Sequence, residues 1–83
     1  MRIYRCKILA DMYINGKFED TENDRVDCFS ANGMATAIKK AIRYAQHQWR
    51  KSSDKDKETG KRYIYIYKNH RVIEANILAE ADV

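Results

Sequence analysis

The chain has 83 residues, enough for one small domain, and its apolar fraction of 45% beside a charged fraction of 34% is typical of a globular protein. This balance excludes a disordered chain, and the absence of proline excludes proline-rich linkers and collagen. No apolar run reaches the roughly 18 residues that a membrane span needs, and the charged first ten residues lack the apolar core of a secretory signal. We therefore expect a single domain over residues 1–83 that is cytoplasmic and has no membrane partner.

The net charge of +4 is distributed unevenly along the chain. Residues 1–10 carry +3 and residues 11–30 carry −4, whereas residues 31–73 carry eleven basic and three acidic side chains and residues 74–83 carry −3. Separated charge of this kind steers an anionic partner toward the basic side of a protein. A solvated surface whose charges compensate one another shows the same pattern, so the charge alone leaves both interpretations open.

Residues 3–14 alternate between apolar and mixed positions, which predicts a β-strand with one wholly apolar face. That face consists of Tyr4, Cys6, Ile8, Ala10, Met12 and Ile14. Asn15-Gly16 follows directly, and this dipeptide accepts the positive φ angles of a tight hairpin turn.

The pairing of residues 17–29 is less clear from the pattern. A return strand begins directly after the turn, but the acidic residues 19–24 predict an irregular stretch. A strand resumes over residues 25–29, with Val26 and Cys28 directed into the core. Cys6 and Cys28 are therefore expected to be reduced and buried, and a disulfide between them is the alternative.

A helix is predicted from about residue 31 to about residue 51, with Ser30 or Asn32 as its N-cap. At 100° per residue one arc of this helix is apolar; it consists of Met34, Ile38, Ala41, Ile42, Ala45 and Trp49. The opposite arc is polar and basic and consists of Lys39, Lys40, Arg43, Gln46, His47, Arg50 and Lys51.

The polar residues 52–60 predict a mobile loop, and two apolar runs follow it, residues 62–68 and 71–78. Asn69-His70 between the two runs is interpreted as the turn of a hairpin. In that register the face toward the helix consists of Ile64, Ile66, Ile73, Ala75 and Ile77. The face away from the helix consists of Tyr63, Tyr65, Tyr67, Val72, Glu74 and Asn76. Residues 79–83 are expected to fray.

These segments predict an α+β fold, an antiparallel sheet of about four strands in the order β-β-α-β-β with one amphipathic helix packed on one face. One helix covers one face of the sheet, so the other face, with its tyrosines and aliphatic side chains, has no cover. This face is the first candidate binding surface, and its residues are Tyr63, Tyr65, Tyr67, Val72, Arg5, Lys7 and Tyr13.

Three hypotheses account for this sheet face. Tyrosine favours strands, so the face is a half-exposed, solvated surface in the first hypothesis. In the second, it is a protein interface, either with a partner protein or with a second copy of the chain, because tyrosine combines a large contact area with a hydroxyl that tolerates water. In the third, bases of a nucleic acid stack on the tyrosines beside basic side chains.

The basic arc of the helix is the second candidate binding surface. Its cationic residues are suited to phosphate contacts, although such an arc is also typical of a helix face that simply meets water. The residues proposed for this surface are Lys39, Lys40, Arg43, His47, Arg50 and Lys51.

The sequence carries no pattern that predicts catalysis. The two cysteines and two histidines lack metal-ligand spacing, and the glycines at 16, 33 and 60 are too scattered for a phosphate-binding loop. We therefore expect no catalytic residue, no metal, no cofactor and no enzyme activity.

The chain opens with a strand (MRIYRCKILADMYI), continues with a short strand that runs into an alanine-rich helix (VDCFSANGMATAIKKAIRYAQ), and closes with the expected hairpin (RYIYIYKNHRVIEANI). This layout resembles that of small bacteriophage and prophage proteins that inhibit host machinery, anti-CRISPR proteins among them. The resemblance implies a single non-catalytic domain that acts by surface contact in the bacterial host cytoplasm. More specifically, we expect an inhibitor of a host nucleic-acid-handling protein complex.

Overall fold

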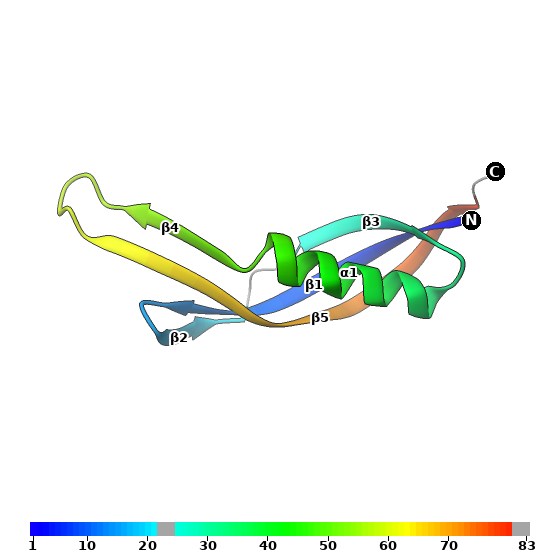
Figure 1. Cartoon of the computed structure of the whole chain (residues 1–83), viewed down its shortest axis with the longest axis horizontal. Coiled ribbons are helices and arrows are strands. Elements are labelled where there is room, and N and C mark those ends of the chain that lie inside the picture. Colours follow the sequence, from blue (N-terminus) through cyan, green and yellow to red (C-terminus); the bar gives the residue numbers. More distant parts are fainter. Residues whose placement is uncertain (22–24, 81–83) are drawn as a thin grey trace.

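The computed structural model describes residues 1–21 and 25–80, with side chains as far as residue 78, and it confirms the α+β fold class. In this part of the chain, one helix packs on an antiparallel sheet of five strands, one more than the four or so that the sequence predicts (Figure 1). The elements, in chain order, are β1 (Arg2–Ile14), β2 (Lys17–Asp20), β3 (Arg25–Ala31), α1 (Met34–Gln48), β4 (Lys51–Lys55) and β5 (Arg62–Glu80).

Strand β1 lies at the centre of the sheet. Strand β5 pairs along one edge of β1, whereas β3 and β2 share the other edge, and β4 pairs with the first part of β5. The β1–β2 turn has positive φ at both Asn15 (48°) and Gly16 (85°), so the predicted tight hairpin is confirmed. Of the predicted irregular stretch 19–24, residues 19 and 20 belong to β2, and residues 22–24 lie outside the described residues.

The predicted closing hairpin is wrong, because β5 is one continuous strand of 19 residues. Asn69 does have a positive φ of 54°, but it forms a bulge: Leu9 pairs with Arg71 while Asp11 pairs with Lys68. The Asn69 side-chain amide donates to Asp11 Oδ2 over 2.9 Å, and Arg71 Nη2 lies 3.2 Å from Asp11 Oδ1. β5 continues past the position of the expected turn because it pairs with the long strand β1 on both sides of the bulge. The contacts of Asn69 and Arg71 with Asp11 stabilise the bulge. The predicted fraying falls on residues 79–83, of which 79 and 80 belong to β5 and 81–83 lie outside the described residues.

The hairpin partner of β5 is β4, in a segment that the sequence predicts as loop. Residues 51–55 pair with residues 62–66 without a register shift. The connecting turn is closed by a hydrogen bond from the Gly60 N–H to the Asp56 carbonyl and by one from the Glu58 N–H to Asp56 Oδ1, over 2.8 and 2.9 Å. The loop prediction is therefore wrong for residues 52–55, which are recruited into the sheet by pairing despite their polar side chains.

Helix α1 is shorter at both ends than predicted, because β3 continues through Ala31 and pairs with Arg2. Gly33 is the N-cap and makes no side-chain cap hydrogen bond, so the predicted caps Ser30 and Asn32 are wrong. Three alanines of α1 lie fully buried against the sheet, which lets the helix approach the strands closely. The buried core consists of Tyr4, Cys6, Ile8, Ala10, Ala31, Ala37, Ala41, Ala45 and Trp49.

The two faces of strand β3 are reversed relative to the prediction. Phe29 pairs with Tyr4 and packs against the core, so Val26 and Cys28 point to the other face. Val26 is 46% exposed, and Cys28 is exposed and free rather than buried. Cys6 is buried and free as predicted, and burial raises the pKa of its thiol.

The molecule is elongated, with principal extents of 53 × 21 × 17 Å and a radius of gyration of 15.7 Å. A compact domain of this length has a radius of gyration of about 12 Å. The 15-residue helix is only about 22 Å long at 1.5 Å per residue, so it covers less than half of the sheet (Figure 1). The part of the sheet that contains β2, β4 and the start of β5 lies beyond the helix.

Candidate functional site

The three alternating tyrosines of β5 lie on the same side of the sheet as the helix. Tyr67 pairs with Met12 and Tyr65 with Ile14, and both partners belong to the face of β1 that carries the buried core. The Tyr67 ring lies 5.3 Å from that of Trp49. The prediction that Tyr67 and Val72 point away from the helix is therefore wrong, since both pack against the core.

We define the tyrosine shelf as the part of this face that continues past the end of α1. Within the described residues, α1 contacts β1, β3 and β5 but not β2 or β4. The side chains of the shelf are half-buried, and Tyr67 at its inner end packs against the core. The shelf residues are Met12, Ile14, Tyr63, Tyr65 and Tyr67.

The inner end of the shelf is fixed by Trp49, which is 6% exposed. The Arg25 guanidinium lies 5.3 Å from the centre of the indole, and the His70 ring meets it edge-on at 5.5 Å. His70 Nε2 donates to the Trp49 carbonyl, and the Tyr67 N–H donates to the Arg50 carbonyl over 2.9 Å. These contacts connect the end of the helix to Tyr67 at the inner end of the tyrosine row.

Polar side chains of both signs border the shelf. On β2, Lys17 pairs with Ile14 and Asp20 with Met12, and on β4, Asp54 pairs with Tyr63. An aromatic and aliphatic centre with a mixed polar rim is the usual anatomy of a protein–protein contact. The two carboxylates make the shelf a poor surface for stacking nucleic-acid bases, because they repel the phosphates.

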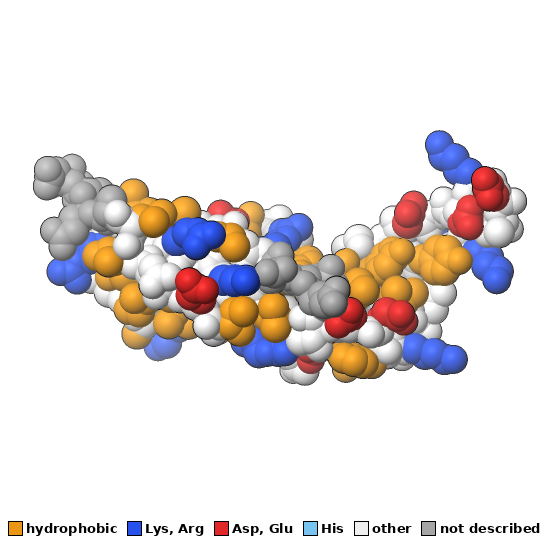
Figure 2. Space-filling model, turned by 180° about the vertical axis from the view of Figure 1, so that it is seen from behind, with side chains coloured by type: hydrophobic (Ala, Val, Ile, Leu, Met, Phe, Trp, Pro, Cys, Tyr) orange, Lys and Arg blue, Asp and Glu red, His pale blue; other side chains and the backbone are white. Residues whose placement is uncertain are grey.

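The predicted sheet-face site is divided between two faces, since Arg5, Lys7 and Tyr13 lie on the side away from the helix. We call this side the rear face; Figure 2 shows apolar side chains along it, interspersed with charged side chains of both signs. Its β1 residues are Ile3, Arg5, Lys7, Leu9, Asp11 and Tyr13. The Tyr13 ring meets the Phe18 ring edge-on at 5.6 Å, and Lys68 Nζ lies 5.2 Å from the Tyr13 centroid.

The isoleucines predicted to face the helix do not form part of the core. Ile66 pairs with Tyr13 and Ile64 with Ser53, on the rear face. Ile77 pairs with Tyr4 and so lies on the predicted side of the sheet, but it is 50% exposed, and Ile73 is 51% exposed. Of that predicted set, Ala75 packs against the core.

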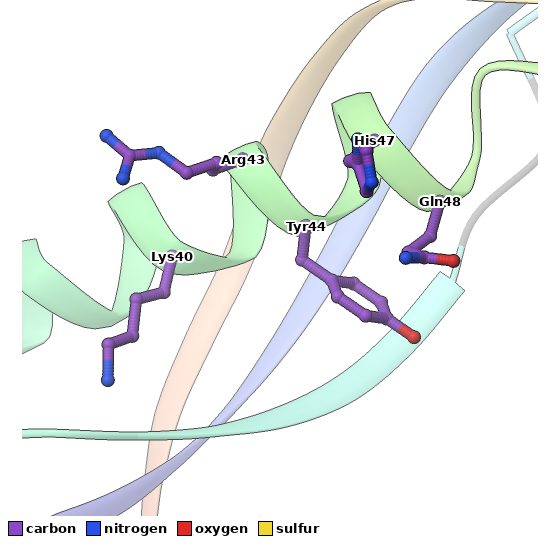
Figure 3. Close-up of a pocket in the computed structure, with 5 residues that line it drawn as sticks. All are labelled: Lys40, Arg43, Tyr44, His47 and Gln48. Carbon is purple, nitrogen blue, oxygen red and sulfur yellow. The ribbon is translucent and has the colours of Figure 1, made fainter.

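The basic helix residues Lys39, Lys40, Arg43 and His47 are exposed on the outer surface of α1, as Figure 3 shows in part. Lys40 Nζ donates to the Ser30 carbonyl of β3 over 2.7 Å. Arg50 follows the helix, whereas Lys51 belongs to β4 and pairs with Ile66 of the rear face. The predicted basic surface is therefore shorter than expected, because the chain leaves the helix at Trp49.

A hollow of about 410 Å³ lies on the basic helix surface. All five residues that line it belong to α1; they are Lys40, Arg43, Tyr44, His47 and Gln48 (Figure 3). The Tyr44 ring meets Phe29 of β3 edge-on at 5.6 Å. A ligand in this hollow would meet a single helical wall, which is not the enclosing geometry of a small-molecule site.

Sequence reasoning missed the contributions of Phe18, Phe29 and Tyr44. A signal for Phe29 was present in the strand period, because Phe29 and Ala31 share one parity and offer more apolar area than Val26 and Cys28. For Tyr44 the local pattern gave no such signal, since its partner lies on another element.

Among the described residues, no three His, Cys, Asp or Glu side chains lie close enough together to hold a metal ion. In the described part of the chain, no helix is both long enough and apolar enough to cross a membrane. Comparisons with protein-family models, with curated proteins and with solved structures give no match for this chain.

Proposed function

We propose that this protein is a non-enzymatic binding module that docks its tyrosine shelf onto a partner protein. The observation that carries the proposal is the early end of α1: the row Tyr63, Tyr65, Tyr67 runs out from beneath Trp49 onto uncovered sheet. Tyr63 and Tyr65 belong to paired strands, so their backbone loses little conformational freedom on binding. They are suited to act as anchors of the interface.

The mixed charge around the shelf favours a protein as the partner. Asp20 of β2 borders the apolar residues on one side, and Asp54 of β4 borders them on the other. Lys17 lies on the same side as Asp20. A protein surface with an apolar recess and polar groups of both signs complements this arrangement. The concrete partner implied by the phage-protein resemblance is a component of a host nucleic-acid-handling complex. That part is a prediction from the sequence layout, and the closing hairpin on which it partly rests is not formed.

Direct nucleic-acid binding is the second candidate function, supported by the exposed basic side chains of Lys39, Arg43 and His47 on α1. Phosphate contacts make affinity fall by about 0.7–0.9 log units per log unit of salt for each contact. Retardation of nucleic acid that disappears steeply with salt, and that depends on Lys39 and Arg43, would favour this candidate over the shelf.

The test uses the full chain as bait in a nuclease-treated bacterial lysate, with quantitative mass spectrometry. The double variant Tyr63→Ala/Tyr65→Ala is compared with wild type and with the control Lys39→Ala/Arg43→Ala. The shelf variant should lose the partner that wild type and control retain, and affinity for the purified partner should fall about thirtyfold or more. A shelf variant that folds and retains every protein bound by wild type contradicts the proposal.

A further inference from the structure

The rear face is a second uncovered surface, distinct from the tyrosine shelf. Val26 is 46% exposed, Phe18 56% and Ile64 36%, although all three are apolar. The row Phe18, Tyr13 and Ile66 crosses three neighbouring strands, because both Phe18 and Ile66 pair with Tyr13. No described element lies over this face, since α1 packs against the opposite one.

The size of the rear face matches one side of a protein interface. The 13 residues of β1 span about 43 Å, and three strands spaced about 4.8 Å apart give a projected area of about 600 Å². The corrugated surface of the side chains is larger than this projection. A stable interface buries about 800 Å² on each partner, so this projection is about three quarters of the area that one partner needs.

The charges of the rear face complement those of a second copy related by a two-fold axis. If the axis crosses β1 at Ile8 and the two copies of β1 stack antiparallel, residue i lies over residue 16 − i of the other copy. Arg5 then lies over Asp11 of the second copy, which also forms an ion pair with Arg71 of its own chain. On β5, Glu74 and Arg71 pair with Lys7 and Leu9, so Glu74 lies over Arg71 of the second copy.

The same operation brings apolar residues together. Ile3 lies over Tyr13 of the second copy, and each of these contacts occurs twice in the dimer. Facing sheets pack about 10 Å apart, and arginine and glutamate side chains that extend from the two sheets bridge this distance.

We propose that the rear face is the interface of a two-fold symmetric homodimer, in which Arg5 and Glu74 of one copy extend the Arg71–Asp11 ion pair of the other copy into a cluster of four charges. This surface is separate from the tyrosine shelf, so the inference does not rest on the proposed function. The dimer presents two shelves on its outer sides.

The first test is the oligomeric state of the full chain by sedimentation equilibrium. Wild type should dimerise, and Arg5→Glu and Glu74→Lys should each weaken the dimer about tenfold or more, because each reversal places like charges together twice. Arg43→Glu on the outer surface of α1 is the matched control and should leave the dimer unchanged. At about 1 mM protein, a dimer with a dissociation constant in the millimolar range is still detected. Wild type that remains monomeric at this concentration overturns the proposal.

The native thiols give a second readout. Cys28 is exposed in the single chain and pairs with Arg5 on the rear face, whereas Cys6 is buried. Alkylation of Cys28 should slow with rising protein concentration in wild type and stay fast in Arg5→Glu. Ile77 pairs with Tyr4 on the side of the sheet that carries α1. A dimer that survives both charge reversals but is broken by Ile77→Lys would use that side, and would overturn the rear-face assignment. Tyr63→Ala/Tyr65→Ala should leave dimerisation intact, which separates this result from the shelf proposal.

Discussion

The covered and uncovered halves of the sheet are built from the same strands and share one apolar row. In the covered half, Tyr4, Cys6 and Ile8 of β1 are buried beneath α1. The same row continues through Met12 and Ile14, which are only half-buried because the helix has ended. The row is therefore apolar along its whole length, although the chain itself covers only part of it. The uncovered half is the part of the sheet that we propose as the docking surface for a partner protein.

The largest expected effect comes from the residue that joins the two halves. Trp49→Ala removes a side chain that is 6% exposed and that contacts Tyr67, His70 and Arg25. Loss of a buried aromatic residue costs about 3–5 kcal/mol, a large part of the stability of a small domain. Urea unfolding followed by circular dichroism measures the change. A variant as stable as wild type would show that Trp49 does not hold the halves together.

A smaller effect is expected from the close contact of helix and sheet in the covered half. Ala41 is fully buried, so Ala41→Leu overfills the space between α1 and β1 and should cost about 1–3 kcal/mol. Ala35, on the exposed side of the same helix, is the matched control. Ala35→Leu should leave the free energy of unfolding within about 0.5 kcal/mol of wild type. Equal effects at the two positions would contradict the alanine contact.

The uncovered half should tolerate substitution much better than the covered half. Tyr65→Ala removes a half-buried ring beyond the end of the helix, and the free energy of unfolding should fall by less than about 1 kcal/mol. Tyr4→Ala, in the covered half, should cost several times more, because Tyr4 is 3% exposed. Thermal unfolding of the two variants compares the halves directly, and a Tyr65→Ala variant that unfolds would place Tyr65 in the core.

The smallest effect concerns the bulge between the two halves. The Asn69 side chain, followed by Thr21 and Arg71, donates hydrogen bonds that lower the pKa of Asp11 below its ordinary value of 3.8. Because the folded pKa is the lower one, the stabilisation is present above pH 3.8 and is lost as the pH falls through the folded pKa. Asp11→Asn should remove this acid-side dependence. Urea titrations of both proteins between neutral and acidic pH measure it, and superimposable pH profiles would contradict the assignment.

Local signals predicted the elements whose conformation depends on neighbouring residues. The alternation of residues 3–14, the Asn15-Gly16 turn and the centre of the helix were all predictable, because each is fixed by propensity and period. Pairing between distant segments decided the rest. Asn69 adopts the same positive φ in a bulge as in a turn, so its sequence context cannot distinguish the two. The polar residues 51–55 become a strand only through pairing with β5.

The candidate site was predictable in composition but not in position. Alternation places Tyr63, Tyr65 and Tyr67 on one face, and that prediction is confirmed by their register. Which face they share depends on where Trp49 packs, a contact between distant residues. The sequence did indicate that the helix covers only part of the sheet, because a helix of 15 to 20 residues is much shorter than a strand with the same number of residues.

The most direct measurement is the solvent accessibility of the tyrosines in the free chain and in the complex with its partner. Chemical modification of tyrosine, read by mass spectrometry, distinguishes each ring. In the free chain, Tyr63 and Tyr65 should react readily and Tyr4, which is 3% exposed, should not. The partner should then protect Tyr63 and Tyr65. Rings at 63 and 65 that are as unreactive as Tyr4 in the free chain, or that stay reactive in the complex, would contradict the account.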